Sequence, residues 1–306
     1  MMGESGLLPE GLRDRLPGEA EAHGVRGRAM LDAIVGAGFA RVAPPLVEYE
    51  DSYVARLTGR RTDLARFVDP QTQRTLCVRS DITPQIARIA ATSLAGGPRP
   101  LRLGYMGPVL RLSAGHLGEG RERTQLGAEL IGRDDVAAAI EVVQVALAAL
   151  DAAGVGDITL DLTLPDLVET LLPEYPRAAR LDQLLDVKDA GRLASEGFEE
   201  WLPLLGMTGA VGPALERLRA FDREGRLASR ISEIEQVAAA IGPQIRVTLD
   251  PTERHGFEYQ SWFGFSLFVP GLPDVIGRGG SYAIARGDGT REPAVGFSLF
   301  PDLLDN

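Results

Sequence analysis

Two segments with the alternation of β-strands, separated by a glycine-rich charged stretch, constrain this fold more than any other part of the sequence. Apolar and polar residues alternate from Arg102 to Leu112 and again from Thr124 to Ile131. The stretch between them mixes charged residues with three glycines, Gly115, Gly118 and Gly120. This pattern predicts a long β-hairpin whose connecting loop is charged.

Three polar side chains of the hairpin suggest a ligand. Arg111 lies at the end of the first segment, and Gln125 and Glu129 lie four residues apart in the second. An even spacing places both on one face of a strand. A carboxylate and an amide beside a guanidinium group suit a zwitterion next to a phosphate. On this stretch alone, a solvated amphipathic hairpin without a ligand is an equally open interpretation.

The chain before the hairpin contains a helix, a strand and a proline-containing edge. Helical periodicity runs from Ala22 to Ala37, and a strand is expected from Phe39 to Val42. Pro44 and Pro45 cannot lie inside a central ladder, so 43–48 should form an edge or a bend. Such an edge could meet a second copy of the chain or be an ordinary surface turn.

A second hairpin and a short helix complete this half of the chain. Two strands, 66–69 and 75–79, are expected to pair as a hairpin, and a helix from Pro84 to Leu94 follows. Ser80 or Asp81 is the expected N-cap of that helix. Because Arg79 flanks the helix N-terminus, the same place could instead hold an anion or another ligand.

The rest of the chain alternates between helical and strand patterns. A core helix is expected from Asp134 or Asp135 to Ala153, then a strand from Ile158 to Leu164. Prolines and glycines divide 166–241 into short amphipathic helices, as in an inserted helical subdomain. Strand patterns return at 245–249, 258–269, 274–276 and 294–300. The glycine-rich segment that starts at Gly277 is more typical of a loop than of a site, but its glycines would also permit close approach of a strand to a ligand or a neighbouring helix.

Composition excludes several classes of function. The net charge of -11 argues against binding nucleic acid by phosphate neutralisation. The single cysteine cannot form an internal disulfide, which fits a reducing compartment. The three histidines are scattered and have no second ligand type at metal spacing, so no metal and no cofactor are expected. No apolar run is long enough for a membrane span and no signal-peptide pattern is present, so the chain is expected to be cytoplasmic.

The order of these segments resembles the catalytic core of class II aminoacyl-tRNA synthetases, most closely the histidyl-tRNA synthetase branch. Three stretches are similar to the family motifs: PPLVE ending at Glu48, GPVLR with RERTQLGAE ending at Glu129, and GRGGSY with EPAVGFSL. The resemblance implies an α+β fold with an antiparallel sheet flanked by helices. The synthetase-like core would comprise 1–165 and 242–306, with 166–241 as a helical insertion. The anticodon-binding domain of the family is not expected.

The resemblance also implies roles for individual residues. VRSDITPQIAR, from Val78, is similar to the stretch that holds the amino group of histidine, here Asp81 and Thr83. Gln125 and Glu129 would be further amino-acid contacts, and Arg111 the phosphate-binding arginine. The stretch RHGFEYQ would bring two more residues, His255 and Tyr259, to this pocket.

The departures from the family pattern fall mainly on the ATP side. His255 stands where the synthetases need an arginine, Gln260 replaces a tyrosine, and Arg123 stands where an aromatic residue stacks on adenine. Leu303 stands where an arginine should close the adenine sandwich. Such groups each contribute a few kcal/mol to the transition state, so adenylation of an amino acid is not expected.

A synthetase-like core with part of its amino-acid pocket resembles the regulatory subunits of ATP phosphoribosyltransferase. This implies a non-catalytic chain that forms a homodimer and joins the short-form catalytic subunit for the first step of histidine biosynthesis. It also implies feedback inhibition by histidine, bound either in the inherited pocket or at a subunit interface. The alternatives are a truncated ligase that adenylates an amino acid, which Arg111 favours and Leu303 opposes, and an amino-acid sensor that binds another enzyme.

Overall fold

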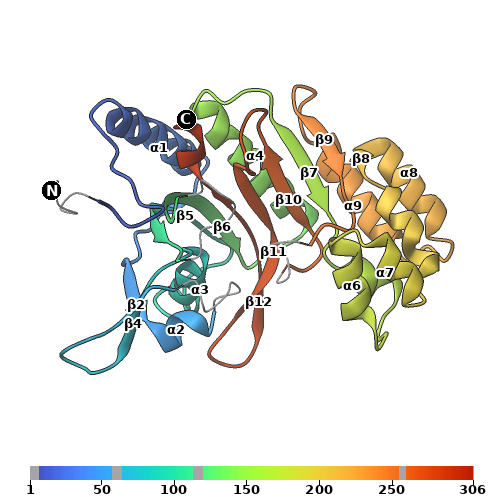
Figure 1. Cartoon of the computed structure of the whole chain (residues 1–306), viewed down its shortest axis with the longest axis horizontal. Coiled ribbons are helices and arrows are strands. Elements are labelled where there is room, and N and C mark those ends of the chain that lie inside the picture. The colour runs from blue at the N-terminus through green and yellow to red at the C-terminus, as the bar shows by residue number, and fades with distance from the viewer. Residues whose placement is uncertain (1–6, 57–63, 113–119, 255–259, 306) are drawn as a thin grey trace.

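The chain folds around one large mixed β-sheet, whose strands lie side by side across Figure 1. The computed structural model describes residues 7–56, 64–112, 120–254 and 260–305. Nine strands follow the order β1-β5-β6-β12-β11-β10-β7-β9-β8. Their bounds are Ala40–Arg41 (β1), Leu101–Leu110 (β5), Glu122–Ile131 (β6), Thr159–Thr163 (β7), Gly209–Ala210 (β8), Arg246–Leu249 (β9), Gly264–Phe268 (β10), Gly277–Ala285 (β11) and Arg291–Leu299 (β12).

Most neighbouring strands of this sheet are antiparallel, and two pairs near its ends are parallel. β1 runs parallel to β5, and β7 runs parallel to β9. The hairpin predicted from the sequence is β5 with β6, in which Leu101 lies opposite Ile131 and Leu110 opposite Glu122. The sheet with helices on both faces confirms the α+β class, and its parallel end pairs refine the expected antiparallel sheet.

Two helices cover opposite faces of the sheet. Successive side chains of each strand point to opposite faces, so each face presents its own set of residues to a helix. The even-numbered residues of β6, such as Leu126 and Leu130, face α4 (Val136–Ala152), which also packs against α1 (Glu19–Gly36). The odd-numbered residues face α3 (Thr83–Ala91), where Ile131 joins a second apolar cluster. The α3 face is apolar only in part, and its polar part is the candidate site described below.

A smaller sheet lies beside α3 in Figure 1. Its three strands, in the order β2-β4-β3, are Val47–Tyr49 (β2), Thr75–Val78 (β4) and Arg66–Val68 (β3), and α2 spans Glu50–Val54. The predicted pairing of β3 with β4 is confirmed. The predicted N-cap of α3 is wrong in position, because Ile82 precedes the helix and no side chain caps it. Asp81 instead accepts a hydrogen bond from the Thr83 amide through Oδ1, at 2.9 Å.

Residues 166–241 are mainly helical, as predicted. The elements are α5 (Leu167–Leu171), α6 (Ala178–Asp186), α7 (Ala190–Ser195), the 3₁₀ helix η2 (Glu199–Gly206), α8 (Val211–Phe221) and α9 (Ala228–Ala239). The short strand β8 joins the large sheet beside β9, and Leu181 and Leu215 belong to the same apolar cluster as α4. The division of the chain into a core and a helical insertion stays a prediction.

The glycine-rich segment at Gly277 corrects the prediction of a loop. It forms β11, near the centre of the sheet, whereas the strand expected at 274–276 is absent and β11 begins one residue later. Glycines obscure the alternation by which a strand is recognised, yet here the close packing of neighbours requires them. A Cβ at Gly279 would lie 2.4 Å from Cζ of the Phe265 ring on β10.

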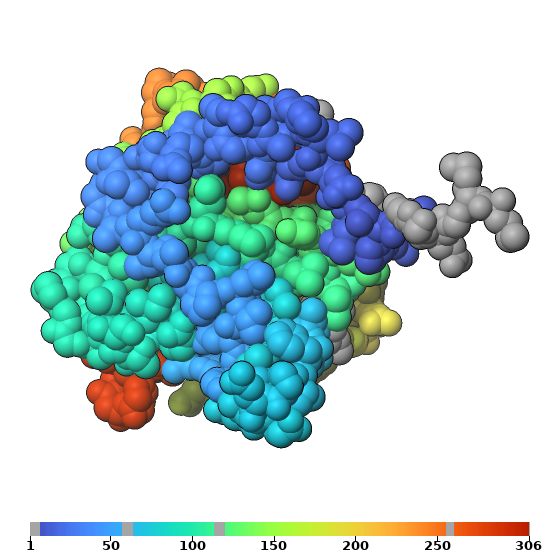
Figure 2. Space-filling model, turned by 90° about the vertical axis from the view of Figure 1, so that its left-hand side faces the viewer, coloured from blue at the N-terminus to red at the C-terminus, as the bar shows by residue number. Residues whose placement is uncertain are grey.

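The N-terminal segment and α1 border one side of the molecule. Figure 2 shows them in blue around a hollow in which the hairpin of β5 and β6 is visible in green. After β12, the chain ends in a 3₁₀ helix, η3 (Pro301–Leu304), which packs against α1 and β6. Among the helices of the described residues, none is long and apolar enough to cross a membrane.

Candidate amino-acid site

The hairpin places Gln125 and Glu129 on the α3 face of the sheet, as their spacing predicts. Both side chains are almost fully buried, each 1% exposed. Gln125 is held at both ends of its amide: Oε1 accepts from the Ile82 amide at 2.8 Å, and Nε2 donates to Asp81 Oδ1 and Ser298 Oγ, each at 2.7 Å. Gln125 therefore joins the start of α3 to β12 beneath the site.

Glu129 is surrounded by hydroxyl groups. Tyr282 donates to Oε2 at 2.8 Å, while Thr83 and Tyr105 lie 3.1 and 3.2 Å from Oε1. Burial raises the pKa of Glu129 to about 8, although these hydroxyl groups act in the opposite direction. A carboxyl group held in this way is neutral at pH 7, and a ligand ammonium group beside it would favour its ionised form.

Glycines form the floor of the site. Gly296 of β12 lies directly opposite Glu129 of β6 and Gly280 of β11, and Gly280 in turn lies opposite Gly264 of β10. Across three adjacent strands, this row presents bare backbone. The side chain of Glu129 uses the space, because a Cβ at Gly296 would lie only 1.6 Å from its Oε2.

A fourth glycine, Gly127 of β6, lets a tyrosine reach the site from β5. A Cβ at Gly127 would lie 2.5 Å from the hydroxyl oxygen of Tyr105, so the tyrosine lies across that glycine. From there its hydroxyl group also lies 3.1 Å from Ser298 Oγ. Tyr105 is fully buried, and burial raises its pKa well above the ordinary value. It therefore acts here as a neutral hydrogen-bonding group.

The structure brings Asp81 and Thr83 to this site, as the resemblance implies. Asp81 is bonded to Gln125 and to the Thr83 amide, and Thr83 Oγ1 reaches both Glu129 and Tyr105. The backbone at Asp81 is fixed from the other side by the buried hydroxyl group of Tyr53. That group accepts from the Asp81 amide and donates to its carbonyl oxygen.

Arg111 lies away from these residues, at the loop end of the hairpin, where its amide bonds to the Arg121 carbonyl oxygen. Its side chain is exposed, its Nε donates to the Ser80 carbonyl oxygen at 3.3 Å, and its guanidinium group lies 5.8 Å from the Phe300 ring. Arg123 lies at the same distance from that ring. Two guanidinium groups beside one aromatic ring make this end of the hairpin cationic.

Two of the predicted site residues, His255 and Tyr259, lie outside the described residues. Three residues that sequence reasoning missed complete the site: Tyr105, Tyr282 and Ser298. Each lies on a strand at a position whose side chain points to the pocket face. Knowing which strands are neighbours, and in which register, would therefore have identified all three. Register between distant strands is not visible in one sequence.

The ATP side of the family pattern is changed in the structure as it is in the sequence. Leu303, where the synthetases carry an arginine, is buried at 8% exposure in η3. The preceding residue of η3, Asp302, instead fixes the hairpin, because its Oδ2 accepts a hydrogen bond from the Thr124 amide at 2.6 Å. The arrangement offers no charged group at position 303 for a nucleotide phosphate.

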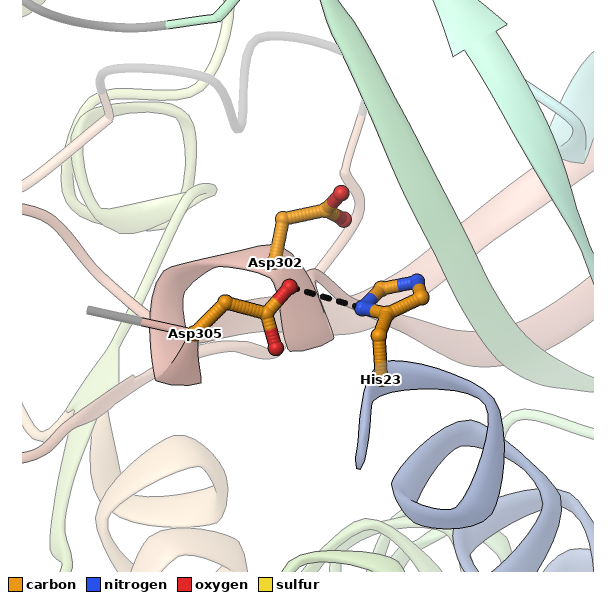
Figure 3. Close-up of side chains that lie close together, drawn as sticks. All are labelled: His23, Asp302 and Asp305. Atoms are coloured by element: carbon orange, nitrogen blue, oxygen red, sulfur yellow. Dashed lines mark hydrogen bonds and ion pairs between the residues drawn. The ribbon is translucent and has the colours of Figure 1, made fainter. Parts of the chain in front are cut away.

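An ion-pair cluster ties α1 to η3 (Figure 3), and the sequence gives no sign of it. His23 Nδ1 lies 2.8 Å from Asp305 Oδ2, and His23 Nε2 lies 2.9 Å from Thr124 Oγ1. Arg15 bonds to both Asp302 and Asp305, and Arg26 bonds to Asp305.

This cluster corrects the expectation that no histidine has other potential ligands nearby. His23, Asp302 and Asp305 could place three ligand atoms within 4.8 Å of one another. A cation does not fit there, however, because two guanidinium groups already bind the carboxylate oxygens and would repel it. We therefore interpret the cluster as a structural link between the first helix and the last turn.

Comparison with known proteins finds similarity to histidyl-tRNA synthetases and to ATP phosphoribosyltransferase regulatory subunits. The histidyl-tRNA synthetase family matches residues 11–304. A curated ATP phosphoribosyltransferase regulatory subunit from Paramagnetospirillum magneticum is 39% identical over 309 residues, which cover 97% of this chain and 80% of the relative. The regulatory subunit of Rhodospirillum centenum is also 39% identical, with 97% and 79% covered.

Solved structures agree with this fold. The chain is similar to an ATP phosphoribosyltransferase regulatory subunit/histidyl-tRNA synthetase from Bacillus halodurans C, with a TM-score of 0.86, 25% identity, and 98% and 82% of the two chains covered. It is also similar to a chain of the ATP phosphoribosyl transferase (HisG:HisZ) complex from Thermotoga maritima. That TM-score is 0.72 at 16% identity, with 94% and 98% covered, a likeness of fold.

Proposed function

The chain belongs to the histidyl-tRNA synthetase family and, within it, to the ATP phosphoribosyltransferase regulatory subunits, and we propose that it serves as this regulatory subunit. In this role it is not itself the catalyst. It joins the short catalytic subunit of the glycosyltransferase complex for the first step of histidine biosynthesis. The observation that carries the proposal is 39% identity to curated regulatory subunits over 97% of the chain.

The site supports a regulatory role over the alternative of an adenylating ligase. Its amino-acid side is built, with Glu129 and Gln125 buried and hydrogen-bonded. Its nucleotide side has Leu303 in place of a cation, and Arg111 alone keeps the pattern of a phosphate ligand. Cationic clamps stabilise the charge that develops at phosphorus, and Leu303 removes one that the family pattern requires, so the site gives weaker support to that chemistry.

We propose that the pocket around Glu129 binds histidine and so mediates the feedback inhibition. Asp81, Thr83, Gln125 and Glu129 would hold the amino group, with His255 and Tyr259 as further contacts. A buried carboxyl group ringed by hydroxyl donors, next to a second acid, is suited to an ammonium group. If histidine binds one arrangement of the complex more tightly than the other, it shifts the equilibrium between the two arrangements. The size of the shift is set by the ratio of the two affinities.

We further propose a homodimer formed through the first-motif region. Six of the eleven large apolar side chains that are exposed among the described residues belong to the first 46 residues: Leu7, Leu8, Leu16, Val25, Val35 and Leu46. The two-residue strand β1 also leaves one end of the large sheet open. Exposed apolar groups in one part of the chain, together with an open sheet edge in the same part, favour contact with another chain.

The test is reconstitution with a short-form ATP phosphoribosyltransferase that is inactive by itself. We expect the wild-type chain to activate this transferase, and histidine then to inhibit the pair. If Glu129 holds the ligand ammonium group, Glu129→Gln should raise the histidine concentration needed for inhibition by tenfold or more, because a charged hydrogen bond is lost.

Three outcomes separate the possibilities. No activation by the wild-type chain would remove the proposed function, and pyrophosphate exchange with ATP and an amino acid would replace it with the ligase. Activation with unchanged inhibition in Glu129→Gln would move the histidine site to a subunit interface. The exposed Glu122→Gln on the same strand is the matched control and should behave as the wild type.

A further inference from the structure

Gln260 lies on the glycine floor of the pocket. Its side chain is only 9% exposed, and it covers Gly280, where a Cβ would lie 2.2 Å from Gln260 Oε1 and 2.4 Å from its amide carbon. The amide therefore occupies the space that a side chain on β11 would fill. Because Gly280 lies directly opposite Gly296, the amide lies one strand away from the carboxyl group of Glu129.

With Gln260 in this position, little space remains between its amide and Glu129. The cavity that remains has a volume of about 20 Å³, and its lining includes Thr83, Glu129, Gln260, Tyr282 and Ser298. This volume holds about one water molecule. Small-molecule pockets begin at roughly 300 Å³, so an amino acid cannot enter unless part of the lining moves.

Among these lining residues, Gln260 is the one held most weakly. Glu129 has three hydroxyl neighbours within 3.2 Å, and those hydroxyl groups belong to strands and a helix of the core. By contrast, Gln260 Oε1 is buried without a hydrogen-bond partner among the described residues. A buried acceptor that lacks a donor costs free energy, and movement into water would satisfy it.

We propose that Gln260 is a plug, an internal competitor that occupies the ligand position in the unliganded chain. The amino group of the ligand would lie at Glu129, and its planar side chain would take the place of the Gln260 amide on the bare backbone of Gly280. Ligand entry then requires the plug to swing off the glycine floor. This inference rests on the proposal that the pocket binds histidine. It adds that the position of Gln260 limits the affinity of the pocket for histidine.

The plug predicts that a smaller residue at position 260 improves binding. The apparent affinity of a site is reduced by the fraction of molecules in which that site is open. If the plug is out in about one molecule in ten, Gln260→Ala should bind histidine about tenfold more tightly than the wild type. Gln260→Met, which has a similar length and no amide, still fills the floor and should stay within about threefold of the wild type.

Isothermal titration calorimetry of histidine into each full-length variant is the measurement. Tighter binding by Gln260→Ala but not by Gln260→Met supports the plug. Weaker or unchanged binding by Gln260→Ala, an equal gain in Gln260→Met, or no binding by any variant overturns it. Gln260→Ser is a second small variant if Gln260→Ala does not fold, and the same outcomes apply.

The reconstitution assay keeps this proposal separate from the proposed function. If the wild-type chain activates the short transferase and the order of affinities is wrong, the plug fails and the regulatory role stands. If the wild-type chain does not activate the transferase, the regulatory role fails whatever the calorimetry shows.

Discussion

At the residue scale, Glu129 combines deep burial with an environment of neutral donors. Its three hydroxyl neighbours, Thr83, Tyr105 and Tyr282, come from α3, β5 and β11. None of these carries a positive charge. Burial without a cation thus accounts for the pKa of about 8 in the unliganded pocket. With that pKa, Glu129 is mainly protonated in the folded chain at pH 7.

This proton predicts how stability depends on pH. The ordinary pKa of a glutamate is about 4.5, so between that value and about 8 the folded chain holds a proton that the unfolded chain has released. Stability should fall as pH rises through this range, by up to about 1.4 kcal/mol per pH unit. Glu129→Gln cannot lose a proton and should lack this part of the decline. Urea unfolding at pH 5.5 and 8.5 measures it.

The exposed Glu122→Gln should keep the pH dependence of the wild type, since its side chain lies outside the pocket. The comparison requires only the difference between the two pH values for each variant, so any fixed cost of the substitution cancels. Equal declines in Glu129→Gln and the wild type would mean that Glu129 is ionised in the folded chain.

At the element scale, the segments with clear periodicity could be predicted and those joined by tertiary contacts could not. The β5–β6 hairpin and α4 follow from alternation and from helical spacing, and α4 begins directly after Asp135, close to the predicted start. β11 was missed because its glycines carry no alternation. His23 and Asp305 are 282 residues apart, so no local pattern could have joined α1 to η3.

The same limit applies to the candidate site. Gln125 and Glu129 share a strand, and their spacing alone places them together. Tyr282 comes from a strand 153 residues further along the chain, and its contact with Glu129 depends on the order of β6, β12 and β11. That order is a property of the whole sheet, which one sequence does not display.

The link between α1 and η3 can be tested at Asp305. Its carboxylate is 2% exposed and binds Arg15, His23 and Arg26. Asp305→Asn removes the charge that these cations share, so we expect a loss of about 3 kcal/mol in the free energy of unfolding, as for other buried ion pairs that lose one partner. Chemical denaturation measures this loss, and the exposed Asp14→Asn should change stability by less than about 0.5 kcal/mol.

The same variants test the interpretation that the cluster holds no cation. Because Arg15 and Arg26 already bind Asp305, EDTA should leave the melting temperature of the wild type unchanged. A fall in melting temperature with EDTA that is absent in Asp305→Asn would instead identify a metal site at this link.

At the scale of the whole molecule, the proposed dimer face lies on the side shown in Figure 2, which α1 and the segment after it border. Val25 is 59% exposed and Leu46 is 44% exposed. The double substitution Val25→Asp with Leu46→Asp places two charges in the proposed interface, so we expect the chain to become monomeric. Sedimentation velocity measures this change in mass.

The control is Val187→Asp, which changes a valine that is 61% exposed in the turn after α6. It should leave the oligomeric state unchanged because α6 lies on the opposite side of the molecule from α1 in Figure 1. A dimer that persists in the double variant would place the contact on another surface, and a wild-type chain that is monomeric in solution would contradict the homodimer itself.

The glycine floor has a consequence for how binding preferences could be altered. Gly264, Gly280 and Gly296 contribute only backbone, so the chemical character of the pocket comes from side chains that reach over them from elsewhere. Glu129 arrives from the neighbouring strand, whereas Gln260 arrives from a connecting segment outside the ladder. The scaffold and its recognition groups are thus separable. If the proposed pocket binds an amino acid, substitutions at Gln260 should change its preference while leaving the strand pairings intact, which makes this position a starting point for engineered metabolite sensors.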